Sequence, residues 1–543
     1  NVNSSSSPGV WSWCQFSLDL KQSLLPAPMW LWKFVILYLQ SCFLCSGLLA
    51  LTLLVVWILL KRTLRQAEAK SPLKRKLEGK ETVGFFHPYC AAGGGGERVL
   101  WCAVDATQRE HPGLHCVVYT GDSSVSPEDM LKQAESRFGV KLCPNSIEFV
   151  YLTSRHLVEA STWPRFTLLG QSLGSIRLGW EAICKFCPDI MVDSMGYAFT
   201  YPIFAYFGRC RLGCYVHYPT ISTDMLASVR TGAVTTCNDA RVAKSRLLSR
   251  VKLVYYNLFA WLYGIVGRCA EVVLVNSSWT RGHIDQLWQV PRRTSTVFPP
   301  CDTTALAALP LEREPSADTF GGHIVVSLAQ FRPEKDHAKQ LRAFKKFLDG
   351  SPERRGSSQD SGVKRVRLIM AGGCRDEGDW GRFRNLEALS TELGLRSRCS
   401  QGNGEEDWDV DLRANLPLSE VQRLLGQATV GLHTMRDEHF GISVVEFMAA
   451  GAVVLAHNSA GPAMDIVRPA RCPAGSSPAG VVGFLASDEA EYAEAMKQIF
   501  SLTAKERMAI GAAARQATSD RFSQESFENA FASRLIAPLR KAS

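Results

Sequence analysis

Short apolar runs alternate with stretches of helical periodicity along most of the chain, which is typical of parallel strands joined by crossover helices. One series of apolar runs predicts strands at residues 82–86, 115–120, 190–193, 213–216 and 272–275. A second series, after a polar break at residues 312–319, predicts strands at residues 324–329, 366–371, 428–433 and 453–457. The pattern therefore predicts an α/β protein with two doubly wound domains.

A long apolar stretch precedes the first predicted strand. Residues 29–60 are rich in Leu and Val, and residues 42–60 contain no charged side chain. Roughly 20 apolar residues cross the hydrocarbon layer of a bilayer, so this stretch predicts a transmembrane helix. A buried core helix would alternate with polar positions, and a cleaved signal peptide would be shorter.

The net charge of +9 is concentrated just behind this stretch. Residues 61–80 hold eight basic and two acidic side chains, which leaves only +3 for the rest of the chain. Because basic flanks stay on the cytosolic side of a membrane, we expect residues 61–543 in the cytosol and residues 1–28 in the lumen. The remaining charge is too small for a broad basic face, so we expect no nucleic-acid partner.

The 543 residues suffice for two large domains with accessory segments. The seventeen cysteines lack the spacing of a zinc site and are interpreted as reduced thiols. Polar insertions are expected at residues 352–363 and 398–409. The predicted parts are a lumenal segment (1–28), a transmembrane anchor (29–60), a basic linker (61–80), a first Rossmann-like domain (81–310), a linker (311–320), a second Rossmann-like domain (321–500) and C-terminal helices (501–543).

Four consecutive glycines follow the first predicted strand and open an amphipathic helix. A backbone without side chains can approach a diphosphate closely, and a helix N-terminus offers unpaired N–H groups. The motif is neither a Walker loop nor a dinucleotide fingerprint. It predicts a phosphate site, with a merely flexible turn as the alternative, at Gly93, Gly94, Gly95 and Gly96.

Two glutamates stand eight positions apart after the predicted strand 428–433. If the whole interval were helical, Glu438 and Glu446 would lie about 12 Å apart along the axis, too far to share one proton. They do not form a hydrolase dyad. Such a separation suits two hydroxyl-bearing ends of one extended ligand, with helix-start amides between them. The alternative is one surface glutamate and one helix-start acid.

These motifs together resemble the retaining GT-B glycosyltransferases of the family 4 type. The resemblance rests on the glycine turn, the pair Glu438 and Glu446, the turn 333–335 and the string 297–302, and it covers residues 82 to the end. Within that family, the strings 85–102, 216–226 and 432–442 are similar to the GDP-mannose-dependent α-1,2-mannosyltransferases of the dolichol pathway.

The resemblance implies a GT-B fold, in which two Rossmann-like domains face each other and an N-terminal transmembrane helix anchors them. The first domain would bind the acceptor, the second the nucleotide sugar, and a long helix at 504–539 would cross back to the first domain. The implied activity is retaining transfer of two successive mannoses from GDP-mannose to trimannosyl-chitobiosyl diphospho-dolichol. The implied location is the cytosolic face of the endoplasmic reticulum membrane, with other dolichol-pathway mannosyltransferases as candidate partners.

The resemblance also assigns roles on the donor side. Glu446 matches the acid that binds the ribose hydroxyls, and Glu438 matches the acid at the transferred sugar. Lys335 matches the cation that stabilises the leaving diphosphate. The usual partner arginine is replaced by Gln330, and Arg332 is its displaced candidate. The donor phosphates or sugar would also contact the amides of Phe440, Gly441, Ile442 and Ser443.

Three further side chains are candidates in the first domain. His217, at the end of the predicted strand 213–216, matches a histidine near the transferred sugar, with a structural hydrogen-bonding role as the alternative. Asp224 and His87 are candidates for the acceptor, although a helix cap and a loop cap explain them equally well. No Asp-x-Asp triplet stands in a strand-end loop, so we expect metal-independent chemistry without a cofactor.

Two other functions remain open at this point. One is another membrane-anchored retaining GT-B enzyme that uses a different nucleotide sugar or lipid acceptor. The other is a non-catalytic nucleotide-binding membrane scaffold, whose signature would be loss of Glu438, Glu446 or Lys335; all three are present. The apolar stretches 166–180 and 251–275 are candidates for lying against the bilayer, with buried helices as the alternative.

Overall fold

The computed structural model describes residues 29–232, 245–312, 322–355, 365–399, 408–467 and 480–541. By its internal contacts the chain divides into two compact units, Asn1–Lys70 and Ser71–Ser543. The predicted lumenal segment 1–28 lies outside the described residues, as do most of the linker 311–320 and parts of both predicted insertions.

The first unit contains one long helix, α2 (Met29–Lys70). Among the described helices, it is the one long and apolar enough to cross a membrane, with a mean hydropathy of 2.6. The helix continues past the apolar stretch because residues 61–70 are good helix formers without Gly or Pro. It ends before Pro72, and Ser71 caps the short helix α3 (Pro72–Lys76).

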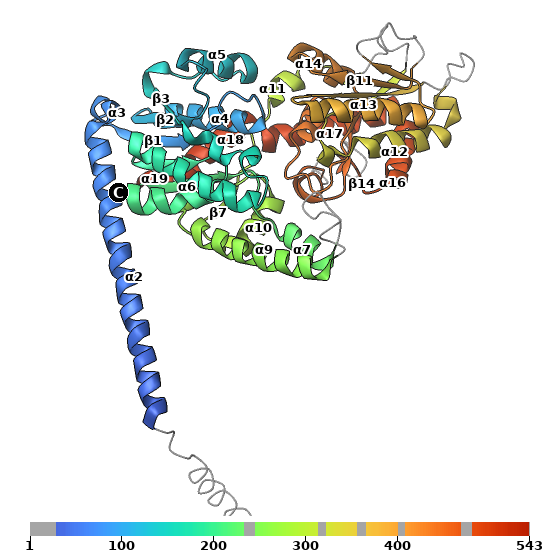
Figure 1. Cartoon of the computed structure of the whole chain (residues 1–543). Helices are drawn as coiled ribbons and strands as arrows, with labels where there is room; N and C mark the ends of the chain where they lie inside the picture. Colours follow the sequence, from blue (N-terminus) through green and yellow to red (C-terminus); the bar gives the residue numbers. More distant parts are fainter. Residues whose placement is uncertain are drawn as a thin grey trace, which may run out of the picture. The chain divides into compact units, whose positions relative to one another are not determined.

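The second unit begins with a parallel seven-stranded sheet in the order β3-β2-β1-β4-β5-β6-β7 (Figure 1). All five strands predicted in this half are confirmed, whereas the short or partly polar strands β3 and β7 carry too weak an apolar signal to be predicted. The strands are β1 (Glu81–Phe86), β2 (Leu114–Thr120), β3 (Ile147–Tyr151), β4 (Ile190–Asp193), β5 (Arg211–Val216), β6 (Val272–Val275) and β7 (Thr294–Thr296).

Helices connect these parallel strands, as the alternating pattern predicted. Crossover helices of this kind cover both faces of a sheet and place the loops that follow the strands at one edge. The main helices of this half are α4 (Gly95–Glu110), α5 (Pro127–Phe138), α6 (Thr167–Lys185), α7 (Thr223–Thr231), α9 (Arg246–Gly267) and α10 (Ser278–Trp288).

A second parallel seven-stranded sheet has the order β10-β11-β9-β8-β12-β13-β14. The four predicted strands are confirmed, and the three others are short or contain charged residues. The strands are β8 (His323–Leu328), β9 (Val366–Gly372), β10 (Ser397–Cys399), β11 (Val410–Ala414), β12 (Val430–Leu432), β13 (Val453–His457) and β14 (Gly483–Ala486). The main helices are α11 (Thr303–Ala307), α12 (His337–Asp349), α13 (Glu377–Glu392), α14 (Leu418–Gln427), α15 (Ile442–Ala449) and α16 (Glu489–Ser501).

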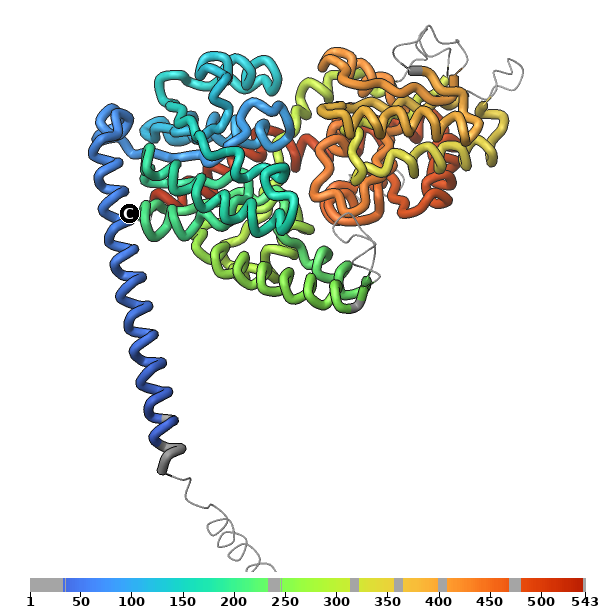
Figure 2. Tube along the Cα trace, viewed as in Figure 1, coloured from blue at the N-terminus to red at the C-terminus, as the bar shows by residue number. Residues whose placement is uncertain are grey.

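The C-terminal segment is not the single long helix predicted at 504–539. It breaks at Ser523, whose extended backbone ends α17 (Ala504–Phe522) and whose hydroxyl accepts the amide N–H of Ser526 to cap α18 (Gln524–Phe531). A π-helical turn and α19 (Ala537–Lys541) follow. Helix α17 packs on α15, whereas α18 packs on α4. The chain thereby returns to the first sheet, as the red segment of Figure 2 shows.

The return segment contributes aromatic side chains to the core of the first sheet. Phe531 is 1% exposed and its ring lies 6.4 Å from that of Phe85. We expect Phe531→Ala to lower the free energy of unfolding by about 3–5 kcal/mol, because it leaves a cavity in a close-packed core. Thermal unfolding of the detergent-solubilised chain, followed by near-ultraviolet circular dichroism, measures this loss. The exposed Asn529→Ala on the same helix is the control, and equal losses in both variants would contradict the packing.

Candidate functional site

The glycine turn joins β1 to α4, as predicted. Gly93 has φ +76°, and a Cβ there would lie 2.5 Å from Arg137. A Cβ on Gly95 would lie 2.7 Å from the side chain of Ile442, at the start of α15. The amide of Gly94 already donates to the Glu97 carboxylate at 2.6 Å, in a capping box. The turn therefore brings the two halves close together, while Glu97 occupies one of the amides predicted to bind phosphate.

His87 lies directly after β1 and is fully buried. Its Nδ1 is 2.9 Å from the Ser194 hydroxyl, which follows the neighbouring strand β4, and its Nε2 is 4.0 Å from Glu97. Burial opposes ionisation of Glu97, but the hydrogen bond and charge of His87 hold the pKa of this acid below its usual value. His87 thus joins two strand ends rather than standing free for a ligand.

His217 follows β5, the strand next to β4 in the sheet. Its ring packs edge-on against Tyr215, and its buried Nε2 has no hydrogen-bond partner among the described residues. Burial, followed by the charge of His87, lowers the pKa of His217 to about 4. The ring is therefore neutral near pH 7 and offers one unpaired nitrogen.

Lys335 and Glu438 meet because the strands that precede them are neighbours. The turn Pro333–Lys335 follows β8, the loop with Glu438 follows β12, and β8 pairs with β12. Lys335 Nζ lies 2.5 Å from Glu438 Oε2, and His433 Nε2 lies 3.1 Å from the same oxygen. Burial alone would raise the pKa of Glu438, but His433 and Lys335 hold it well below its usual range. Glu438 is an ionised carboxylate between two basic groups.

Arg332 is not brought to this cluster. It is half-buried at the start of the turn, and its charge acts on Asp379 of α13, where it helps Arg382 to lower the pKa of that buried acid against the effect of burial. The structure therefore does not place Arg332 beside Lys335. The contacts of Lys335 are instead with Glu438 and Met435.

Glu446 lies one turn into α15, away from the Lys335 and Glu438 pair. The helix begins only at Ile442, so the interval between the two glutamates is half loop, not the continuous helix that the distance estimate assumed. Gly441, with φ +111°, caps this helix in a conformation that favours glycine. Burial raises the pKa of Glu446 to about 7, opposed by the charge of Arg98 on α4.

The four residues predicted to offer amides stand at the start of α15. Phe440 is buried, and its ring packs 5.7 Å from Phe298 and 5.4 Å from Phe522, so its side chain belongs to the core. Ile442 contacts the glycine turn, as described above. Backbone N–H groups of this first turn have no partner within the helix, so they are available to an anion.

Side chains from both halves meet around the loop that carries Glu438. The ring of His439 stacks at 4.1 Å on Tyr218 and at 5.3 Å on Trp279. Ser278, at the start of α10, donates through its amide and its hydroxyl to Asp465 at 2.8 and 2.6 Å. These contacts hold the glycine turn and the start of α15 together.

Asp224 lies in the first turn of α7, where the cap alternative placed it. Its carboxylate is 3.4 Å from His283 Nε2, whose hydrogen bond lowers the pKa of this acid. Its side chain is 54% exposed. The charge of Arg436, from the loop that carries Glu438, also acts on Asp224. Asp224 therefore faces the meeting point of the halves.

Sequence reasoning missed four residues of this site. His433 was hidden because it lies at the end of a predicted strand, although strand ends are where ligand groups gather. Tyr218 and Trp279 read as ordinary aromatics. Arg98 was only part of a motif string, yet its Nε and Nη2 atoms are buried with no hydrogen-bond partner among the described residues.

The described residues contain no group of three or more His, Cys, Asp or Glu side chains arranged to hold a metal ion. The acids of β11 and the residue before it are committed to ion pairs. Asp409 is buried and contacts Arg355, Arg365 and Arg396, and Asp411 contacts Arg413. They form a structural charge cluster on the second sheet.

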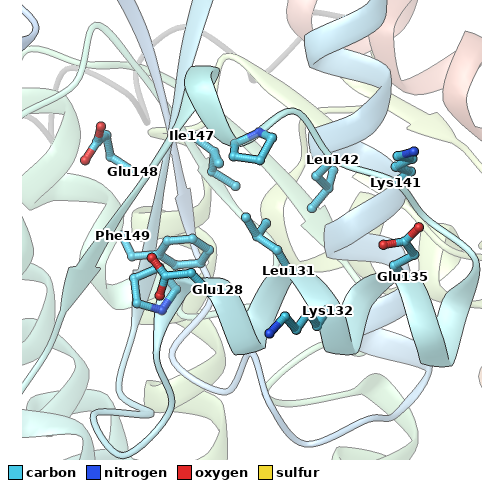
Figure 3. A pocket seen from close by; sticks show the side chains of 11 residues that line it. Glu128, Leu131, Lys132, Glu135, Lys141, Leu142, Ile147, Glu148 and Phe149 are labelled. Atoms are coloured by element: carbon cyan, nitrogen blue, oxygen red, sulfur yellow. The ribbon is translucent and has the colours of Figure 1, made fainter.

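A pocket of about 550 Å³ lies elsewhere, between α5 and the residues that lead into β3 (Figure 3). Leu131, Leu142 and Ile147 line its middle, with Lys132 and Glu135 on α5. None of the candidate site residues lines it. Its mixed charges and distance in the fold from the strand-end loops set it apart from the site.

Solved structures with the same architecture are glycosyltransferases or related proteins. The N-terminal domain of trehalose-6-phosphate phosphatase from Candida albicans has a TM-score of 0.58 at 13% identity and covers 84% of this chain and 97% of its own. Sucrose-phosphate synthase from Thermosynechococcus elongatus has a TM-score of 0.57 at 16% identity and covers 86% and 100%. At such identities the likeness bears on the fold, and it confirms the predicted GT-B architecture.

Comparison of the sequence reaches further. Residues 80–288 match the family described as ALG11 mannosyltransferase N-terminus, and residues 312–517 match Glycosyl transferases group 1. A protein from Mus musculus named GDP-Man:Man(3)GlcNAc(2)-PP-Dol alpha-1,2-mannosyltransferase is 46% identical over 500 residues, covering 92% of this chain and 95% of that protein. The Homo sapiens protein of the same name is 44% identical over 503 residues, with the same coverage. The chain therefore belongs to the family of GDP-Man:Man(3)GlcNAc(2)-PP-Dol alpha-1,2-mannosyltransferases.

Proposed function

We infer that the protein is a mannosyltransferase that transfers mannose from GDP-mannose, in α-1,2 linkage, to Man(3)GlcNAc(2) diphospho-dolichol. The names of the mouse, human and Dictyostelium discoideum relatives support this donor, acceptor and linkage. The structural observation that carries it is the cluster of Lys335, Glu438 and His433 beside the start of α15. We further propose that the anomeric configuration is retained and that two mannoses are added in succession.

The transferred sugar would lie between the two halves of the second unit. In the step we propose, the bond between C1 of mannose and the phosphate oxygen breaks, and GDP leaves with the electron pair. The acceptor hydroxyl oxygen bonds to the same face of C1, and its proton passes to the departing phosphate oxygen. Negative charge therefore grows on the diphosphate, where Lys335 and the amides at the start of α15 would stabilise it.

Glu438 has two effects in this proposal. It holds Lys335 in place through the 2.5 Å contact, and its ionised carboxylate accepts hydrogen bonds from the hydroxyls of the sugar. Glu446 would bind the ribose hydroxyls further along α15. His217, neutral near pH 7, would offer its unpaired nitrogen to the sugar without adding positive charge. Asp224 would face the acceptor.

The positive charge that the leaving group needs comes from the protein in this proposal, so we expect the reaction to need neither a metal ion nor another cofactor. We propose that residues 81–310 bind the acceptor, and residues 321–500 the donor. The α2 helix would anchor the chain in the endoplasmic reticulum membrane, with the catalytic unit on the cytosolic face and other mannosyltransferases of the pathway as partners. The eight basic residues in 61–80 support this orientation.

A change at Glu438 tests the site and the activity together. We expect Glu438→Gln to lower kcat by about 10²–10³-fold, because it removes the charge that orients Lys335 and contacts the sugar. The measurement is transfer of labelled mannose from GDP-mannose to the trimannosyl lipid, with EDTA present throughout. Glu334→Gln, an exposed acid in the adjacent turn, is the control and should leave the rate unchanged.

Product that resists EDTA and is removed by an α-1,2-mannosidase would support donor, linkage and metal independence together. Transfer from other nucleotide sugars only would favour a different GT-B enzyme. Binding of GDP without any transfer would favour a membrane scaffold. No present observation supports either of those two functions.

The pKa of Glu446, about 7, makes donor binding sensitive to pH. The ionised carboxylate accepts from both ribose hydroxyls, whereas the protonated form, which dominates below pH 7, accepts less well. We therefore expect kcat/KM for GDP-mannose to fall by up to about tenfold per pH unit below 7 and to level off above it. In Glu446→Gln this pH dependence should disappear, leaving a low kcat/KM at every pH.

Two neighbouring charges allow a matched test of this assignment. Arg98 lowers and Asp302 raises the pKa of Glu446. Arg98→Gln should therefore move the midpoint of the kcat/KM profile to higher pH, and Asp302→Asn should move it to lower pH. The asparagine retains the cap that Asp302 provides to α11. Shifts in the same direction would exclude Glu446 as the titrating group.

A further inference from the structure

Helix α9 is apolar on two sides. One side is buried in the first domain and includes Phe259 and Tyr263. On the other side, side chains spaced alternately by four and three residues fall on one face of the helix and are exposed. They form a stripe of about 27 Å along the axis and comprise Leu247, Val251 (61% exposed), Val254 (68%), Leu258 (54%), Trp261 (61%) and Ile265.

Helix α6 carries a second exposed stripe. Leu169, Leu173 and Ile176 continue from Phe166, which is 70% exposed and precedes the helix. The ring of Phe166 lies edge-on at 5.8 Å from that of Tyr255 on α9, so the two helices meet there. The two stripes form one surface of the first domain, which we call the α6–α9 face; Figure 1 labels both helices.

Such a surface needs a covering phase. Soluble monomers rarely expose contiguous apolar patches larger than a few hundred Å², because each exposed leucine or tryptophan loses the free energy that burial supplies. The charges beside the stripes indicate what covers this one. Helix α9 contains no Asp or Glu, and Arg250 is exposed on it. The single acid of α6, Glu181, is buried and bound by Lys185, whereas Arg177 is exposed.

We propose that the α6–α9 face lies in the interfacial layer of the membrane, with its aliphatic side chains among the acyl chains and its basic side chains at anionic headgroups. Amphipathic helices with this arrangement lie in the plane of the bilayer surface, and tryptophan favours the headgroup level. The proposal deepens the proposed function, since it would place the acceptor-binding domain at the leaflet that holds the lipid acceptor. Its evidence, however, is independent of the chemistry of transfer.

A second copy of the chain fits this face less well. In a symmetric dimer the same patch meets itself, so the basic side chains beside the two stripes would approach one another without acids to pair with them. A bilayer surface with anionic lipids meets both the apolar and the basic requirement at once.

The proposal can be tested without measuring catalysis. A benzophenone amino acid replaces Leu258 in the full chain, which is reconstituted in phosphatidylcholine vesicles with about one phosphatidylinositol in five lipids. The control carries the same group at Leu418 of α14, which is equally exposed at 55% but stands alone. On illumination we expect lipid adducts at position 258 at several times the yield at position 418. Equal yields, or protein dimers cross-linked at 258, would overturn the proposal.

Activity gives a second readout on the same surface. Val254→Gln, Leu258→Gln and Trp261→Gln together should lower transfer to acceptor embedded in vesicles at least fivefold, as surface attachment raises the local acceptor concentration. Transfer to a short-chain acceptor in detergent should stay within twofold of the parent chain. If both rates fall together, the face acts on the fold and the proposal fails. If no transfer occurs even in the parent chain, the proposed function fails, and the lipid adducts still decide the membrane face.

Discussion

The second domain is organised around the pairing of two largely buried opposite charges, Lys335 and Glu438. Removing a charge from water is costly unless a partner compensates it, so neither group is stable at this position alone. The contact joins the turn after β8 to the loop after β12, and the amide of Gly461, after β13, donates to the backbone of Glu438. Three strand ends are thus fixed around one carboxylate, which also sets where α15 begins.

The first domain meets this arrangement through close contact rather than through charge. The glycine turn can approach the start of α15 because Gly95 has no side chain where Ile442 lies. The ring of His439 stacks on Tyr218, and Asp465 receives the start of α10. The return of the C-terminal segment, from α17 on the second sheet to α18 on the first, ties the same two halves by a continuous chain. A site shared by two domains needs such ties, since its chemistry depends on distances between groups from both.

Strongly apolar segments could be predicted from the sequence with good boundaries. Strands β4, β6 and β13 appear at the predicted residues, and the parallel order follows from the alternation with helices. Strands such as β7, with its Thr-Ser-Thr sequence, were missed because a short strand stabilised by its neighbours needs no apolar pattern of its own. The break at Ser523 was missed for a related reason. A serine inside a helical pattern is a weak signal until packing on two different sheets requires the chain to turn.

The candidate site shows the same division. The chemical types and the loops that carry them, Glu438, Glu446, Lys335 and His217, follow from residue pattern and family resemblance, because parallel strands gather their following loops at one edge. Which groups touch does not follow, because through-space distances depend on strand order. That order pairs Lys335 with Glu438, sends Arg332 toward Asp379, and gives the Gly94 amide to Glu97. Helix α9 has an apolar sequence whichever way it faces; only its packing in the folded domain shows that one of its two apolar sides is covered and the other is exposed.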